Sequence, residues 1–113
     1  MSPENLSPEN LKGHLDMLLL SALDGRPAHG YAVLERLREQ SRGTFDLPEG
    51  TIYPALHRLE AGGLLASRWS EASGRRRRVY QLTPKGRRSF EKRRREWQFF
   101  VRGVESVLGG GAA

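Results

Sequence analysis

The 113-residue sequence contains no cysteine and no long apolar run. Without cysteine there can be no disulfide, no thiolate metal site and no cysteine nucleophile. His14, His29 and His57 stand apart from one another, so we expect neither a metal site nor a cofactor. A nucleophile elbow, a P-loop and a carboxylate pair suited to acid–base chemistry are also missing. We therefore do not expect an enzyme.

Signals for membrane insertion and secretion are missing as well. The most apolar run, LDMLLLSAL at 15–23, is too short to cross a bilayer, which takes roughly 20 residues. The N-terminal MSPENLSPENL lacks the basic-then-apolar order of a signal peptide. With 37% hydrophobic residues the chain can bury one modest core. The composition predicts a soluble cytoplasmic protein of one domain, with no membrane attachment.

Positive charge is concentrated in one third of the chain. Between Arg75 and Arg95 there are nine Arg and two Lys against one acidic residue, Glu91, which gives a local balance of +10. The net charge is +6, so the remainder of the chain carries −4. Such clustering favours a polyanionic partner, in the first place nucleic acid and in the second an anionic membrane surface.

The first part of the chain predicts two helices and an extended segment. The first helix covers about 8–23, with Ser7 as N-cap and Pro8 at its first position. The second covers about 29–43, where apolar residues form one stripe. TFDL at 44–47 is predicted as a short extended piece that leads into a third helix.

The third helix is predicted for PEGTIYPALHRLEAGGLL, from Pro48 to the glycines at 62–63. Its residues Ile52, Leu56 and Leu59 recur at helical spacing and should face the core. Glycine and proline in the opening turns make this end of the helix slim, so that it can approach another surface closely. The outer surface then carries Gly50, Thr51, Pro54, His57 and Arg58, with Tyr53 at its border.

Two alternating segments, LLASRWS at 64–70 and RVYQLT at 78–83, predict a β-hairpin. The connecting EASGRRR contains a glycine that permits the chain to reverse. We therefore expect Arg75–Arg77 to project from the hairpin tip and Arg78 to enter the second strand. Trp69, at the end of the first strand, is interpreted as a packing residue.

TPKG opens a final helix, with Thr83 as N-cap and Pro84 at the first helical position. Its apolar residues follow the 7, 4, 3, 4 spacing of a coiled-coil seam: Phe90, Trp97, Val101, Val104 and Leu108. A single helix with such a seam, and no further domain to cover it, predicts a homodimer.

This order of elements is that of a winged helix-turn-helix followed by a long C-terminal helix, a mainly α fold with a small β-hairpin. The predicted second and third helices form the helix-turn-helix. In this motif the second helix of the pair, here the predicted third helix, lies in the DNA major groove with its N-terminal residues nearest the bases. We divide the chain into an N-terminal tail at 1–7, a DNA-binding domain at 8–83, a dimerisation helix at 84–108 and a flexible tail at 109–113.

Several motifs resemble those of the PadR-like transcriptional regulators. They are LDMLLLSAL, HGYAVLERL, EGTIYPALHRLEAGGLL and GRRRRVYQLTPKG, and the resemblance covers roughly 11–88. It implies a dimeric winged-helix repressor that binds a near-palindromic double-stranded DNA operator. A single final helix is similar to the short form of the family. The resemblance also implies release by a small aromatic or lipophilic effector.

The candidate DNA-binding residues combine the slim helix end, the hairpin tip and the tyrosine of HGY. They are Tyr31, Glu49, Gly50, Thr51, Tyr53, Pro54, Arg58, Arg75, Arg76 and Arg77. Alternatives remain open at this point. Tyr31 suits a phosphate contact or a core aromatic, and His29 suits a helix cap better than a DNA contact. Trp97 and Phe100 suit an effector pocket or the core of the dimer interface.

The basic residues at 87–95 suit either an extended phosphate footprint or a solvated helix face. For the whole chain, the alternative function is a non-specific nucleic-acid-binding or ribosome-associated module. A winged helix that binds only protein is a third alternative, although the density of arginine at the hairpin tip argues against it.

Overall fold

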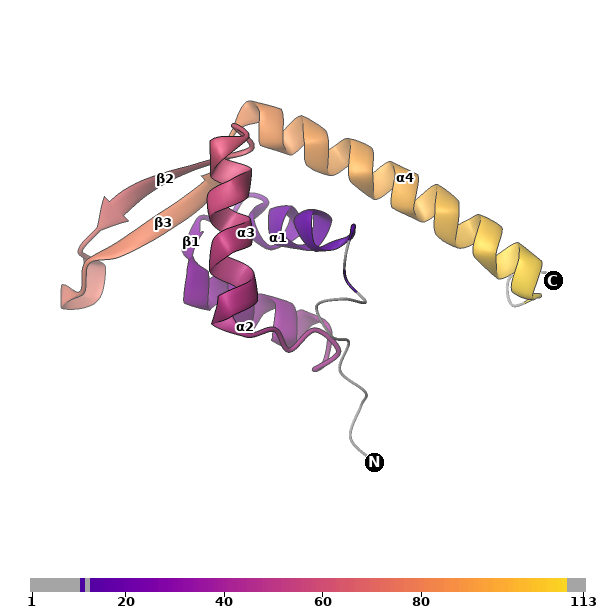
Figure 1. The fold of residues 1–113 in the computed structure, drawn as a ribbon, viewed down its shortest axis with the longest axis horizontal. Helices are drawn as coiled ribbons and strands as arrows, with labels where there is room; N and C mark the ends of the chain where they lie inside the picture. The colour runs from indigo at the N-terminus through magenta and orange to yellow at the C-terminus, as the bar shows by residue number, and fades with distance from the viewer. Residues whose placement is uncertain (1–10, 12, 110–113) are drawn as a thin grey trace.

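The computed structural model describes residue 11 and residues 13–109. These residues form four helices and a small sheet; a two-stranded hairpin projects from one side of the body of the molecule, and the last helix extends away on the other (Figure 1). The fold is therefore mainly α with a small antiparallel sheet, as predicted. The elements are α1 (Leu15–Leu23), β1 (Ala28–His29), α2 (Gly30–Gln40), α3 (Glu49–Ala61), β2 (Leu65–Ser70), a 3-10 turn η1 (Ala72–Gly74), β3 (Arg77–Leu82) and α4 (Pro84–Leu108).

Helix α1 begins at Leu15, later than the sequence predicts. Gly13 has a φ of 90°, in the left-handed region that favours glycine, and this interrupts the helical backbone before His14. The predicted cap Ser7 and the predicted first residue Pro8 lie outside the described residues. At its C-terminal end the helix stops at Leu23, as expected.

The sheet has the order β1-β3-β2, with all neighbours antiparallel. Strand β1 was not predicted from the sequence: Ala28–His29 pairs with β3, whereas the extended piece expected at 44–47 is not part of the sheet. Strand β3 begins at Arg77, opposite Ser70 of β2. The strand that leads into α2 is thus hydrogen-bonded to the hairpin, which we call the wing.

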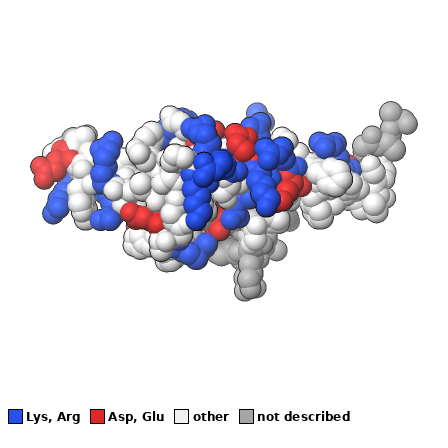
Figure 2. All heavy atoms as spheres, turned by 90° about the horizontal axis from the view of Figure 1, so that it is seen from above, with Lys and Arg blue, Asp and Glu red and all other residues white. Residues whose placement is uncertain are grey.

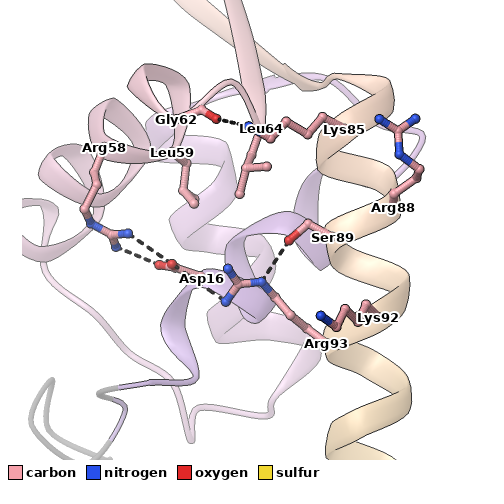
Figure 3. Close-up of a pocket in the computed structure, with 10 residues that line it drawn as sticks. All are labelled: Asp16, Arg58, Leu59, Gly62, Leu64, Lys85, Arg88, Ser89, Lys92 and Arg93. Carbon is pink, nitrogen blue, oxygen red and sulfur yellow. Dashed lines mark hydrogen bonds and ion pairs between the residues drawn. The ribbon is translucent and has the colours of Figure 1, made fainter.

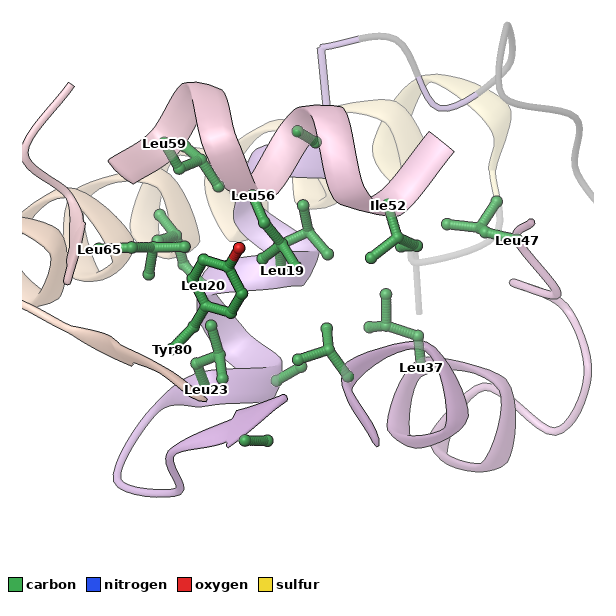
Figure 4. Close-up of a cluster of buried hydrophobic side chains, with 14 of the residues drawn as sticks. Leu19, Leu20, Leu23, Leu37, Leu47, Ile52, Leu56, Leu59, Leu65 and Tyr80 are labelled. Atoms are coloured by element: carbon green, nitrogen blue, oxygen red, sulfur yellow. The ribbon is translucent and has the colours of Figure 1, made fainter. Parts of the chain in front are cut away.

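The core lies between α1, α2, α3 and the inner face of the sheet (Figure 4). Ile52, Leu56 and Leu59 of α3 are buried in it, which confirms the helical spacing read from the sequence. Tyr80 and Leu82, two positions apart in β3, both point into this core. Tyr80 is the largest side chain that is fully buried there.

Thr83 caps α4 as predicted, because its hydroxyl accepts a hydrogen bond from the backbone N–H of Gly86 at 2.9 Å. A side chain at position 86 would collide with the carbonyl of Leu64, so only glycine lets α4 pack here. Phe90 is buried in the same core. That finding corrects its assignment to the dimer seam, since the chain's own residues already cover it. Beyond it, none of the α4 residues is buried.

Candidate nucleic-acid interface

The N-terminal end of α3 carries small residues on its outer side. Gly50 and Pro54 are exposed, and Thr51 is half-buried. Apart from the adjoining residues and backbone of α3 itself, no atom lies within 4 Å of the place where a side chain at position 50 would begin. Pro54 lies inside the helix and offers no N–H to the carbonyl of Gly50. The opening turns of α3 are therefore slim and accessible, as the sequence indicates.

A hollow of about 490 Å³ lies between this end of α3, the start of α2 and the wing. Six of the candidate DNA-binding residues line it: Tyr31, Glu49, Tyr53, Arg75, Arg76 and Arg77. His29, Gly30, Trp69 and Arg78 complete the lining. The structure thus brings together three segments that are distant in the sequence: the start of α2, the start of α3 and the tip of the wing. We call this hollow the wing hollow.

Tyr31 is half-exposed, with 51% of its surface accessible, and so it is not a core aromatic. A hydrogen bond to the Glu35 carboxylate raises the pKa of the Tyr31 hydroxyl, and the negative charge of Glu35 raises it further. The hydroxyl therefore keeps its proton. The Glu35 carboxylate also forms an ion pair, at 3.2 Å, with Arg38, which lies about one turn further along α2.

His29 caps α2, because its Nδ1 accepts from the backbone N–H of Ala32 at 3.3 Å. Its Nε2 lies 2.7 Å from a guanidinium nitrogen of Arg77. Partial burial lowers the pKa of His29, and the charges of Arg77 and Arg36 lower it further, so the imidazole is neutral. A neutral imidazole has only one acceptor nitrogen. The cap uses Nδ1 as the acceptor, whereas a hydrogen bond from Arg77, which can only donate, uses Nε2, so the two hydrogen bonds belong to different tautomers of the ring.

Of the four consecutive arginines, Arg75 and Arg76 lie at the tip of the wing, whereas Arg77, which was predicted to lie there too, already belongs to strand β3. Arg75 and Arg76 are exposed in the turn that follows η1. Arg77 is half-buried in β3 and faces His29, so it does not project from the tip as predicted. Arg78 enters the strand, as predicted.

Trp69 is not an ordinary packing residue, because 52% of its surface is exposed. The guanidinium carbons of Arg76 and Arg78 lie 4.4 and 5.2 Å from the centroid of its ring. The contact of Trp69 with two arginines was not predicted from the sequence. Nor was the position of Arg78 and Gly30 in the lining of the wing hollow. The available signal was the position of a tryptophan across the predicted hairpin from an arginine.

Arg58 is separate from the other candidates. Its guanidinium donates to both carboxylate oxygens of Asp16 in α1, at 2.6 and 3.0 Å (Figure 3). The hydrogen bond from Arg58 lowers the pKa of Asp16 against the opposing effect of burial, and the charges of Arg58 and Arg93 lower it further. Arg58 thus lines a different hollow, of about 600 Å³, between α1, α3 and α4.

Basic side chains of α4 border that second hollow, among them Lys85, Arg88 and Lys92. Figure 2 shows Lys and Arg gathered over the wing and the middle of the molecule, while the C-terminal end of α4 is mainly uncharged. Within the described residues, no helix is long and apolar enough to cross a membrane. In the same part of the chain, no three His, Cys, Asp or Glu side chains are grouped to hold a metal ion.

Comparison with known proteins agrees with this geometry. Residues 19–92 match the sequence model of the transcriptional regulator PadR-like family. The transcriptional regulator Rv3488 of Mycobacterium tuberculosis is 47% identical over 73 residues, which are 65% of this chain and 65% of that protein. This chain therefore aligns with slightly less than two thirds of that relative's length.

Solved structures of similar proteins share the fold. A PadR family transcriptional regulator from Eggerthella lenta has a TM-score of 0.76 and 35% identity, over 88% of this chain and 86% of that one. A PadR family transcription regulator from Clostridium difficile has a TM-score of 0.75 and 36% identity, over 85% of this chain and 99% of that one. With the family match, the slim helix end and the basic wing in agreement, this chain belongs to the PadR-like family of transcriptional regulators.

Proposed function

We propose that the protein is a dimeric repressor that binds a near-palindromic operator and is released by a small aromatic or lipophilic effector. The observation that carries the proposal is the wing hollow, in which the start of α2, the start of α3 and the arginine-rich wing converge. As a DNA-bound regulator it would act in the cytoplasm.

In this arrangement the N-terminal end of α3 enters the major groove, where Thr51 and Tyr53 face the bases. Arg75 and Arg76 contact phosphates and supply affinity and registration rather than sequence choice. Glu49 can only accept hydrogen bonds, so it suits the amino group of a cytosine and disfavours a phosphate. Arg77, held beside His29 at the rim of the hollow, has further N–H groups that can donate to a phosphate oxygen.

Dimerisation is supported by an apolar face on the second half of α4. Val104 and Leu108 of the predicted seam are 36% and 77% exposed, and Val101 is half-buried. The face also includes Phe99, Phe100 and Val107. An amphipathic helix with such a face is stable in water when another surface covers it. A second copy related by a two-fold axis would present two copies of α3 to the two halves of a palindrome.

The effector site is proposed at a hollow of about 310 Å³ between α1 and α4. Trp97 and Phe100 line it, together with His14 and Met17 of the N-terminal part. The Trp97 ring meets the His14 ring edge-on, with 5.0 Å between the ring centroids. An aromatic or lipophilic compound bound here would contact both the winged-helix body and the helix proposed to dimerise. It can release DNA only if it binds the DNA-incompetent arrangement more tightly.

The test is a selection of bound sequences from random duplex DNA, followed by titration of the selected duplex and a scrambled one. We expect the selected site to be two-fold symmetric and bound at least about 10³-fold more tightly at physiological salt. Equal affinities would overturn the proposal in favour of a non-specific nucleic-acid-binding module. Sedimentation of Val104→Glu against wild type tests the dimer, because a charge in the seam should produce monomers.

A further inference from the structure

We propose that Trp69 is a positioning residue of the wing, through which α3 fixes the place of Arg76. This inference rests on the proposed DNA-binding function and adds to it a chain of contacts that runs from Glu60 in α3 through Ser67, Arg78 and Trp69 to Arg76. The chain lies on the face of the wing that turns toward the core, since Tyr80 occupies the same face.

The first part of the chain consists of hydrogen bonds with a defined direction. The Ser67 hydroxyl donates to Glu60 Oε2 at 2.6 Å, and Arg78 Nε donates to the same hydroxyl oxygen at 2.7 Å. A guanidinium can only donate and a carboxylate can only accept, so the single hydroxyl proton must point to Glu60. Arg78 also lies 3.8 Å from Glu60 Oε2. Arg78 is therefore tied to α3 through Ser67 of the neighbouring strand β2.

The second part of the chain is aromatic. Trp69 stands opposite Arg78 in the β2–β3 register, and the guanidinium carbon of Arg78 is 5.2 Å from the ring centroid. The guanidinium of Arg76 lies over the same ring at 4.4 Å. Both distances are within the range of cation–π attraction. The indole thus connects an arginine that is anchored to an arginine that is exposed at the tip.

Stacking leaves Arg76 able to bind phosphate. A guanidinium that stacks on an aromatic ring uses its flat face, whereas its five N–H donors lie in the plane and stay available. Among the described residues, Arg76 has no carboxylate partner within 4 Å. A long exposed side chain would otherwise lose rotamer freedom on binding DNA, and the Trp69 ring restricts that freedom beforehand. The contact therefore preorganises Arg76 over the wing hollow.

A double-mutant cycle on the full chain tests the proposal, with Trp69→Ala, Arg76→Ala and both together. Arg76→Ala should weaken binding to every duplex and lower the salt slope by about 0.9, the value for one lost phosphate contact. Trp69→Ala should weaken binding by about three- to tenfold in the wild-type background, and have almost no effect once Arg76 is gone. Equal losses in both backgrounds would overturn the proposal, because Trp69 would then act without Arg76.

Two further variants separate positioning from other roles. Trp69→Tyr keeps an aromatic face and should recover most of the lost affinity. Glu60→Ala should weaken binding, because Arg78 loses its anchor, although removal of a negative charge alone would strengthen it. Glu71→Ala is the matched control, since it removes an exposed carboxylate of the same wing and should strengthen binding slightly. Tighter binding by Glu60→Ala would contradict the proposed chain.

A measurement on the free protein keeps this inference separate from the proposed function. The side-chain protons of Arg76 should show an upfield ring-current shift in NMR spectra of the wild type, and this shift should vanish in Trp69→Ala. Unshifted Arg76 protons in the wild type would overturn the positioning role. If instead the shift is present but operator and scrambled duplexes bind equally, the proposed function fails while the positioning role stands.

Discussion

The ring of Tyr53 lies against the backbone of Gly30, in the space that a side chain at position 30 would need. A Cβ added there would be 2.7 Å from Tyr53 Cζ and 2.9 Å from its hydroxyl oxygen, closer than real Cβ contacts come. This contact joins the first residue of α2 to the exposed end of α3. The glycine of the HGY motif is thus a steric requirement for the placement of an aromatic side chain that we propose faces DNA.

Gly30→Ala should displace the Tyr53 ring and weaken operator binding by about tenfold, or about 1.4 kcal/mol. The helix itself should not suffer, because alanine is a better helix former than glycine. Fluorescence anisotropy with labelled operator measures the loss. In a Tyr53→Ala background the same change should be neutral, and a further tenfold loss there would contradict the steric explanation.

Gly50→Ala should separate stability from binding. Apart from the adjoining part of α3 itself, no atom of the protein lies near the added methyl group, and the helix gains from the better helix former, so the free energy of unfolding should rise by up to about 0.5–1 kcal/mol. Operator binding should nevertheless weaken, because the methyl group would occupy the space between α3 and DNA. Thermal melting and titration of the same preparation give both quantities. Unchanged affinity would mean that this end of α3 does not approach DNA closely.

Arg58→Ala should reduce stability and leave operator binding within about twofold, because Arg58 is committed to Asp16. Asp16→Asn should cost about 1 kcal/mol, a modest figure because the Arg58 side chain is 59% exposed. Since the pKa of folded Asp16 is lowered, its stabilisation is complete above the unfolded pKa near 3.8 and is lost as pH falls through the folded pKa. Acid unfolding below pH 4 should therefore be less steep in Asp16→Asn.

Arg58→Ala also decides whether Arg58 contacts DNA, as the sequence suggested. If Arg58→Ala lost operator affinity tenfold and also lowered the salt slope by about 0.9, a phosphate contact by Arg58 would be established.

His29 should make the stability of the protein depend on pH near neutrality. The pKa of folded His29 lies below its usual 6.5, so the unfolded chain takes up the proton first as pH falls. The stabilisation is complete above about pH 6.5 and is lost toward the lower folded pKa. His29→Asn keeps a good N-cap residue and removes the titration. Its melting temperature should change less between pH 7.5 and 5.5 than that of the wild type, and an equally steep decrease would contradict this role.

Local signals in the sequence were sufficient for most of the fold. The spacing of Ile52, Leu56 and Leu59 predicted which side of α3 is buried, and Thr83 followed by proline predicted the start of α4. Such features depend on residues a few positions apart, which interact within the same helix. The wing was predicted for the same reason, because alternation and a glycine-containing turn are local properties.

Apart from the late start of α1, which Gly13 sets locally, the errors involve partners that are distant in the sequence. Strand β1 is two residues long, and its pairing with β3 spans about fifty positions, so no alternation could reveal it. The Arg58–Asp16 pair joins residues 42 positions apart. Arg77 differs from its neighbours only because the fold places His29 beside it. For the candidate site, the sequence identified the residue types and the three segments, but not which arginines are free.

The arrangement of α4 has a consequence for how regulators of this kind diverge. Phe90 is its last buried residue, so the second half of the helix contributes little to the folding of the rest of the chain. Substitutions there can accumulate without harm to the winged helix. In the dimer that we propose, changes in these few turns alone would keep several such proteins in one cell from forming mixed pairs, because specificity between related partners is a difference in affinity. New regulators could then arise by gene duplication with their DNA-reading surface initially unaltered.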